Sequence, residues 1–166
     1  GLNDTGVTQC LDAAGALVAC SAAGALAGQD GASGRDALAL TSGAADGRVG
    51  FSFTAAGGCV TDNVTGLVWD GTAEAAATLA AAQANLATAN ATARCGHADW
   101  RLPTAAELAS LVDNGLSTGA RIDPVFAATP AAGFWSSEAY AGDTRAAWLV
   151  DFGSGAVAFD TATNPL

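Results

Sequence analysis

The chain has no lysine and no methionine, and all six of its cationic residues are arginines. Sixteen acidic residues give a formal net charge of −10 at pH 7. Because nucleic-acid binding depends on a basic face, this balance argues against a nucleic acid as the partner and disfavours an anionic sugar polymer. An acidic surface keeps a protein soluble and suits calcium or neutral ligands, although charge alone identifies no partner.

Long apolar runs are also lacking. No run approaches the roughly 20 residues that a bilayer-spanning helix needs. Polar residues such as Thr78, Gln83 and Asn85 interrupt the alanine-rich stretch at 73–93, so we expect a soluble helix there and a chain that does not span a membrane. The chain does not start with a charged segment and an apolar block, and we expect a mature protein whose export signal has been removed.

Large apolar side chains are scarce before Phe51, and glycine is frequent there. Such a segment cannot build a hydrophobic core of its own. We therefore expect residues 1–48 to form an extended, glycine- and alanine-rich arm, and residues 49–166 to form one domain.

The four cysteines can pair in three ways, and the sequence does not choose among them. We favour local pairing, with Cys10 bonded to Cys20 in the arm and Cys59 bonded to Cys95 across the alanine-rich segment. These loops would contribute roughly 3 and 4 kcal/mol on the chain-entropy model. A zinc site is the alternative, although no two cysteines have the close C-x2–4-C spacing of structural zinc sites. Disulfides need an oxidising compartment, so we expect an extracellular or cell-surface protein.

The first half of the domain has the pattern of short strands followed by a helix. Residues 49–54 alternate between apolar and small or polar side chains, which predicts a strand. Turn-forming residues then lead into a short apolar strand at 67–69. Gly71 and Thr72 are expected to open the long helix, with Glu74 favourable in its first turn.

The clearest local signal is the step from Trp100 and Arg101 into the next helix. Pro103 disfavours helix before it, Thr104 can cap the first turn, and Glu107 completes a capping box. Trp100 and Arg101 suit a buried aromatic anchor beside an ion pair. We interpret this segment as a structural signature rather than a chemical one.

The second half of the domain changes from helical to strand periodicity. We expect a helix at 105–113, a loop at 122–126 and a strand at 134–140. A glycine-bearing turn should then join strands at 148–152 and 156–160 into a hairpin. The order of strand, helix, helix and a run of strands predicts an α+β fold, with two helices packed on a small antiparallel sheet.

Several pieces of the chain, in this order, resemble the Lcl C-terminal domain family, named for a bacterial collagen-like adhesin. The resemblance covers about residues 51–160, and the matching pieces are 59–69, 95–96, 99–104, 107–108, 122–123, 134–137 and 147–148. It implies a C-type-lectin-like fold, related to formylglycine-generating enzyme domains. It also implies a secreted or surface-exposed bacterial module for adhesion, ligand binding or assembly, with a mainly core role for Trp69, Trp100, Trp135 and Trp148.

We expect no enzymatic activity and name no catalytic residue. His97 is the single histidine, and no spacing places Ser136 or Ser137 beside it with an orienting carboxylate such as Asp99. The related formylglycine-generating chemistry needs cysteines near the end of the domain, and none follows Cys95.

Calcium is the one cofactor left open. Lectin-like folds often use this ion, which takes oxygen ligands. The sequence offers Asp113, Asp123 and Glu138 in expected loops, without the spacing of an EF-hand.

Two functions remain open. In the first, the module binds a glycan or another surface ligand through Tyr140 as a stacking ring, with Asp143, Arg145 and Asn114 as polar partners. Ordinary packing is the alternative role for Tyr140. In the second, the chain is a structural subunit of an extracellular filament or other homopolymeric assembly, and its N-terminal arm contacts a neighbouring copy.

Overall fold

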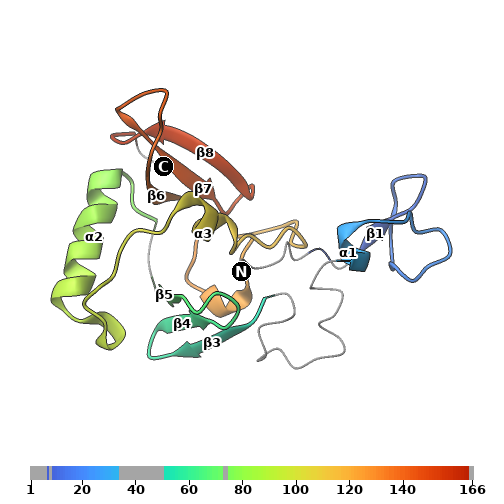
Figure 1. The fold of residues 1–166 in the computed structure, drawn as a ribbon, viewed down its shortest axis with the longest axis horizontal. Helices are drawn as coiled ribbons and strands as arrows, with labels where there is room; N and C mark the ends of the chain where they lie inside the picture. The colour runs from blue at the N-terminus through green and yellow to red at the C-terminus, as the bar shows by residue number, and fades with distance from the viewer. Residues whose placement is uncertain (1–6, 8, 34–50, 73–74, 165–166) are drawn as a thin grey trace.

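A computed structural model describes residues 7, 9–33, 51–72 and 75–164 of the chain (Figure 1). Within these residues the strands form three small antiparallel sheets, which confirms the predicted mixture of helices and antiparallel strands. The C-type-lectin-like relation stays a prediction. The elements are β1 (Cys10–Leu11), β2 (Leu17–Val18), α1 (Asp30–Ser33), β3 (Phe53–Ala56), β4 (Cys59–Asp62), β5 (Val68–Asp70), α2 (Leu79–Ala91), η3 (Arg94–Gly96), α3 (Ala105–Ala109), η4 (Pro124–Phe126), β6 (Gly133–Ala139), β7 (Ala146–Asp151) and β8 (Ala156–Thr161).

The described part of the predicted arm contains a small hairpin. Strands β1 and β2 pair antiparallel, and the predicted Cys10–Cys20 disulfide closes the loop that carries β2. The side chain of Gln29 bonds to both the backbone N–H and the carbonyl of Leu11, at 2.8 and 2.9 Å. The hairpin is thus held by one covalent and several polar links, while the boundary predicted at residues 48 and 49 lies outside the described residues.

The central strand of the sheet β3–β4–β5 is β4. Strand β3 begins at Phe53, so Phe51 and Ser52 of the predicted strand do not belong to it, and residues 49 and 50 lie outside the described residues. Pairing with β4 across the Gly57-Gly58 turn sets the register of β3. At the far end of β4, the buried carboxylate of Asp62 accepts the N–H groups of Val64 and Thr65 at 2.8 and 3.2 Å. That turn returns the chain into β5.

Helix α2 begins at Leu79, so the predicted start at Gly71 and Thr72 is wrong. Thr72 does not cap a helix, because its hydroxyl and N–H both donate to the carboxylate of Asp70. The observed cap is Thr78, whose side chain accepts the N–H of Ala81 at 3.2 Å.

The capping box before α3 is present as predicted. The hydroxyl of Thr104 accepts the N–H of Glu107 at 3.1 Å, and the carboxylate of Glu107 accepts the N–H of Thr104 at 2.8 Å. The helix ends at Ala109, however, earlier than the predicted end near residue 113. The chain continues in tighter turns, in which Leu111 and Val112 donate to carbonyls three residues back.

A short 3-10 helix, η4, occupies most of the segment that was predicted as a loop at 122–126. The carboxylate of Asp123 accepts the N–H of Val125 at 2.8 Å, and Pro124 stands at the first helical position. An aspartate cap followed by proline favours such a turn.

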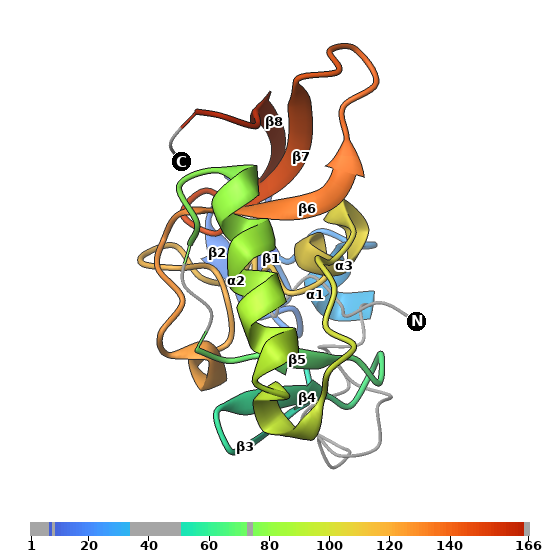
Figure 2. The ribbon, with the colours of Figure 1, turned by 90° about the vertical axis from the view of Figure 1, so that its left-hand side faces the viewer.

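The sheet β6–β7–β8 has β7 at its centre, as the predicted hairpin requires. Its two faces are buried in different clusters. One face gives Val150 to the main core, where α3 contributes Leu108. The other face gives Trp135 and Leu149 to a smaller cluster with Ala82 of α2, and Figure 2 shows the upper end of α2 beside β6 and β7.

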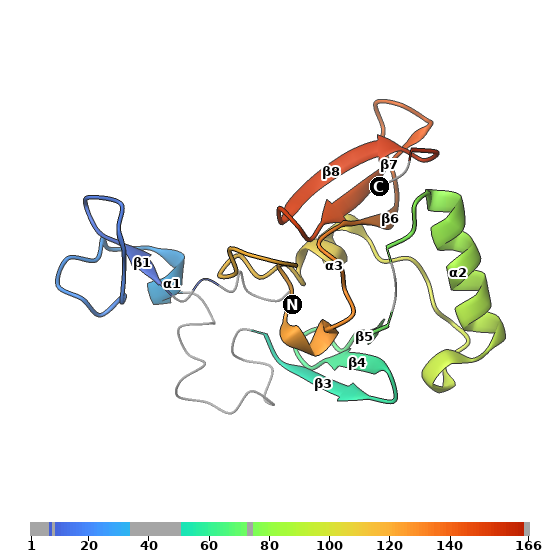
Figure 3. The ribbon, with the colours of Figure 1, turned by 180° about the vertical axis from the view of Figure 1, so that it is seen from behind.

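The sheets β3–β4–β5 and β6–β7–β8 lie at opposite ends of the domain, with α3 between them (Figure 3). The predicted Cys59–Cys95 disulfide ties the first of these sheets to η3, the turn that follows α2, with a Cα–Cα distance of 6.4 Å. Both predicted disulfides are therefore confirmed. Among the residues that the structure describes, no helix has the length and apolar character needed to cross a bilayer.

Candidate functional site

Three aromatic side chains meet at one end of the sheet β6–β7–β8 and form what we call the aromatic cluster: Tyr140, Trp148 and Phe159. Trp148 and Phe159 are directly paired across β7 and β8, so their side chains share a face. The rings of Tyr140 and Phe159 stack with centroids 3.8 Å apart and an interplanar angle of 3°. Trp148 meets both rings edge-on, at 5.3 and 5.7 Å.

Phe159 is the most exposed ring of this cluster. Phe159 covers one face of Tyr140, and Gly142 lies so close to Tyr140 that a Cβ there would come within 2.6 Å of the ring. Tyr140, the ring that the sequence suggested for stacking, is therefore largely engaged in packing. Phe159 is 50% exposed although one face of its ring stacks on Tyr140.

A charged pair stands in the turn directly after Tyr140. Arg145 donates to both carboxylate oxygens of Asp143, at 2.8 and 3.1 Å, and its backbone N–H bonds to the same group at 2.9 Å. The side-chain hydrogen bond from Arg145, followed by the backbone one, lowers the pKa of Asp143 to about 2. Because the side chain of Arg145 remains 80% exposed, the pair still presents donors to solvent beside the aromatic cluster.

The fourth predicted ligand residue, Asn114, is not part of this group. Its side-chain oxygen lies 3.5 Å from the position that a Cβ on Gly155 would take. Gly155 belongs to the turn at the opposite end of β7 from Arg145. A strand of this length spans roughly 20 Å, at about 3.3 Å per residue.

The three candidate calcium ligands are not brought together either. Burial raises the pKa of Asp113 above its ordinary value, and the negative charge of Asp123 raises it further, which places these two carboxylates near each other. Glu138 instead accepts the N–H of Ala105, at the start of α3, at 2.7 Å. Across residues 7, 9–33, 51–72 and 75–164, no group of three or more His, Cys, Asp or Glu side chains is placed to hold a metal ion.

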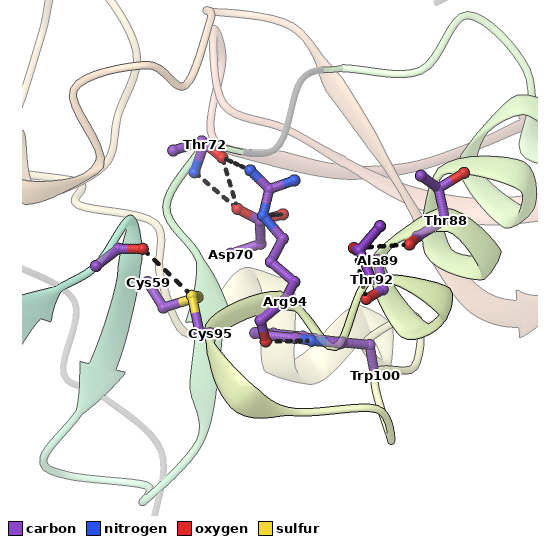
Figure 4. A network of polar contacts seen from close by, with 10 residues as sticks. Cys59, Asp70, Thr72, Thr88, Ala89, Thr92, Arg94, Cys95 and Trp100 are labelled. Carbon is purple, nitrogen blue, oxygen red and sulfur yellow. Dashed lines mark hydrogen bonds and ion pairs between the residues drawn. A yellow bond between two sulfur atoms is a disulfide. The ribbon is translucent and has the colours of Figure 1, made fainter.

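The signature around Trp100 connects three segments. The side chain of Asn90, at the end of α2, bonds to both the N–H and the carbonyl of Trp100, at 2.7 and 2.9 Å. The indole N–H of Trp100 donates to the carbonyl of Arg94 at 3.1 Å (Figure 4). Arg101 then binds both carboxylate oxygens of Glu107, at 2.7 and 2.8 Å. These contacts hold α2, the following loop and α3 together, although Trp100 is half-buried rather than the buried anchor that the sequence predicts.

The single histidine contacts an aspartate and a tryptophan. His97 lies 3.9 Å from Asp99 and meets the ring of Trp100 edge-on. Ser136 is fully buried, and its hydroxyl accepts the N–H of Glu138 at 3.1 Å.

The model of the Lcl C-terminal domain family matches residues 58–166. The chain belongs to this family. No curated protein and no solved structure matches it significantly. The Lcl domain indicates an extracellular bacterial module, and the two disulfides fit an oxidising compartment.

The residue of the Lcl domain that sequence reasoning missed at this surface is Phe159. Strand β8 alternates Val157 and Phe159 with alanines, so its large side chains share one face. That pattern predicts a core face. At the edge of the sheet, however, Val157 and Phe159 are 48% and 50% exposed.

Proposed function

We propose that this chain is a non-enzymatic extracellular binding module that takes a neutral glycan on the aromatic cluster. The observation that carries the proposal is the open face of Phe159 beside the Asp143–Arg145 pair. The C–H face of a sugar ring packs on an aromatic ring, and its hydroxyls can bond to a carboxylate and a guanidinium.

Charge supports a neutral rather than an anionic glycan. The chain has a net charge of −10, which repels anionic polymers. At the surface itself, the charge of Arg145 is balanced by Asp143.

A binding role also agrees with the chemistry of the described residues. His97 contacts Asp99 and Trp100, and the buried hydroxyl of Ser136 accepts the N–H of Glu138, which supports a binding role over a serine–histidine nucleophile. Asp143 and Arg145 form a hydrogen-bonded ion pair. Such a pair is better suited to hydrogen bonding with a ligand than to transferring a proton.

Replacing Phe159 by alanine should weaken glycan binding at least about fivefold, since loss of a central aromatic contact that costs more than about 1 kcal/mol changes the affinity by that factor. A glycan array, with and without calcium, identifies the sugar, and calorimetry then measures its affinity for the wild type and Phe159→Ala. Leu17→Ala is the matched control, because Leu17 is 67% exposed but lies in β2 of the arm. An array without hits, or full affinity in Phe159→Ala, would contradict this function.

Self-assembly is the second candidate, and the arm carries the observation that favours it. Of the five exposed large apolar side chains in the described residues, three lie in the arm: Leu11, Leu17 and Leu26, with exposures of 42, 67 and 50%. Leu11 and Leu17 are directly paired across β1 and β2, so their exposed side chains share one face, and exposed apolar side chains that share a face are typical of a contact surface. A neighbouring copy of the chain would cover them.

The double variant Leu17→Asp/Leu26→Asp should stay monomeric at concentrations where the wild type associates, because a charge cannot be buried unpaired in an apolar contact. Light scattering over a range of concentrations gives the mass of each. Val157→Asp, an equally exposed site on β8, is the control and should associate as the wild type does. A wild-type chain that remains monomeric at all concentrations would remove this candidate.

A further inference from the structure

The side chains next to Phe159 on its face of β8 are Val157 on one side and Thr161 on the other, because side chains alternate between the two faces of a strand. The pairing with β7 agrees with this arrangement. Phe159 lies opposite Trp148 and Val157 lies opposite Val150, and directly paired residues project to the same face. Val157 therefore adjoins the aromatic cluster.

Val157 is an exposed apolar side chain that the cluster leaves uncovered. It is 48% exposed, close to the 50% of Phe159. Of the exposed large apolar side chains in the described residues, these two are the ones outside the arm. Adjoining apolar groups on a protein surface are typical of a contact with a ligand or partner.

The surface on either side of Phe159 differs in polarity. Beyond Thr161, the N–H of Ala162 bonds to the backbone carbonyl of Arg145 at 2.8 Å, so the Asp143–Arg145 pair lies near that end of β8. Val157 lies on the side of Phe159 away from this pair. A sugar ring on Phe159 would thus have hydrogen-bonding groups toward one side and an apolar side chain toward the other.

The spacing of the two side chains suits a substituent of a single sugar ring. Residues two apart on a strand are separated by about 6.6 Å, at about 3.3 Å per residue. A substituent of a hexopyranose on Phe159 can extend over this distance. A hydroxyl placed over Val157 would lose hydrogen bonds to water without gaining a partner, whereas a methyl group would gain from burial.

We infer that the aromatic cluster and Val157 together select neutral sugars that carry a methyl group, with the ring on Phe159 and the methyl group on Val157. Two kinds of sugar have this chemistry: 2-acetamido sugars and 6-deoxyhexoses. The inference rests on the proposed glycan-binding function and adds to it the class of sugar.

Titration followed by NMR tests this preference with methyl glycosides of the gluco, galacto and manno series, each as the 2-acetamido, the 6-deoxy and the unmodified sugar. At least one methyl-bearing sugar should bind about fourfold more tightly than its unmodified parent, the factor that corresponds to burial of one methyl group. The 2-acetamido and 6-deoxy sugars show which of the two sources of the methyl group is preferred. Saturation-transfer spectra should show that its methyl protons contact the protein.

Val157→Thr should abolish the preference, because threonine keeps the branched shape of valine but replaces one methyl group by a hydroxyl. The preferred sugar should then bind about as weakly as its unmodified parent. Val157→Ile is the matched control, since it keeps an apolar, β-branched side chain in the strand and should retain the preference.

The outcomes separate this inference from the proposed function. If unmodified hexoses bind as tightly as their methyl-bearing forms, or if Val157→Thr keeps the full preference, the selection by Val157 is wrong while glycan binding stands. If none of the sugars binds and a glycan array also gives no hits, both are wrong. The spectra of the wild type test the methyl contact directly, so a failure of Val157→Thr to fold would not leave the inference open.

Discussion

Replacing Cys59 and Cys95 together by serine should lower the free energy of unfolding of the domain by about 4 kcal/mol. The disulfide joins residues 36 apart in sequence, and on the chain-entropy model its loss releases that loop in the unfolded chain. Urea denaturation followed by tryptophan fluorescence measures the change.

The position of the disulfide gives its loss a structural consequence as well. Cys59 is buried in the central strand β4, whereas Cys95 lies in the exposed turn after α2. Without the bond, polar contacts such as that between Arg94 and Asp70 would have to hold this turn against the sheet. Because the side chain of Arg94 is 43% exposed, that ion pair contributes only about 1 kcal/mol or less.

Loss of the other disulfide is the matched control. In the Cys10→Ser/Cys20→Ser variant, the main unfolding transition should keep its midpoint, because the arm is expected to add little to the core of the domain. A wild-type midpoint in the Cys59→Ser/Cys95→Ser variant would contradict the stabilising role of that bond. Equal destabilisation in the two variants would instead contradict the division of the chain into an arm at residues 1–48 and a separate domain at residues 49–166.

Features set by neighbouring residues could be predicted from the sequence. The capping box needs only Thr104 and Glu107 three residues apart, and the hairpin at β7 and β8 needs only a glycine-bearing turn between alternating strands. Local pairing of the cysteines also proved correct.

Helix ends were harder to predict, because they depend on partners that are distant in sequence. Thr72 and Thr78 are both plausible caps, and the structure uses Thr78 since Thr72 bonds to Asp70 and to Arg94. Arg94 is 22 residues away from Thr72 in sequence, so no local sequence pattern indicates that contact.

The candidate sites depend on tertiary structure even more strongly. The alternation in β8 identifies a face with Phe159 on it, but only the sheet order shows that β8 is an edge strand. The family resemblance implies a core role for Trp69 and Trp135, and only the structure shows that the two rings pack in different clusters, Trp69 against the main core and Trp135 against Ala82 of α2.

Glu107→Gln should lower the free energy of unfolding by about 1 kcal/mol at pH 7. Hydrogen bonds from the Arg101 guanidinium, more than any other cause, lower the pKa of the Glu107 carboxyl from 4.5 to about 2. Such a shift corresponds to about 3 kcal/mol, and we reduce this to about 1 because the side chain of Arg101 is 57% exposed and solvent screens the ion pair. Glutamine keeps an acceptor for the capping box but loses the charge that binds Arg101.

The same shift fixes the pH range in which the effect appears. A carboxyl whose pKa is lower in the folded state stabilises the fold above its unfolded pKa, and this contribution is lost as the pH falls through the folded value. The wild type should therefore lose this stabilisation between about pH 4.5 and pH 2, and Glu107→Gln should show a weaker pH dependence in that range.

Asp143→Asn is the isosteric control. The pKa of Asp143 is also about 2, but its partner Arg145 is 80% exposed, so solvent and salt should screen the effect of this substitution on stability. If urea midpoints measured from pH 7 to pH 2 fall equally in the wild type and Glu107→Gln, the Arg101–Glu107 pair does not stabilise the step into α3.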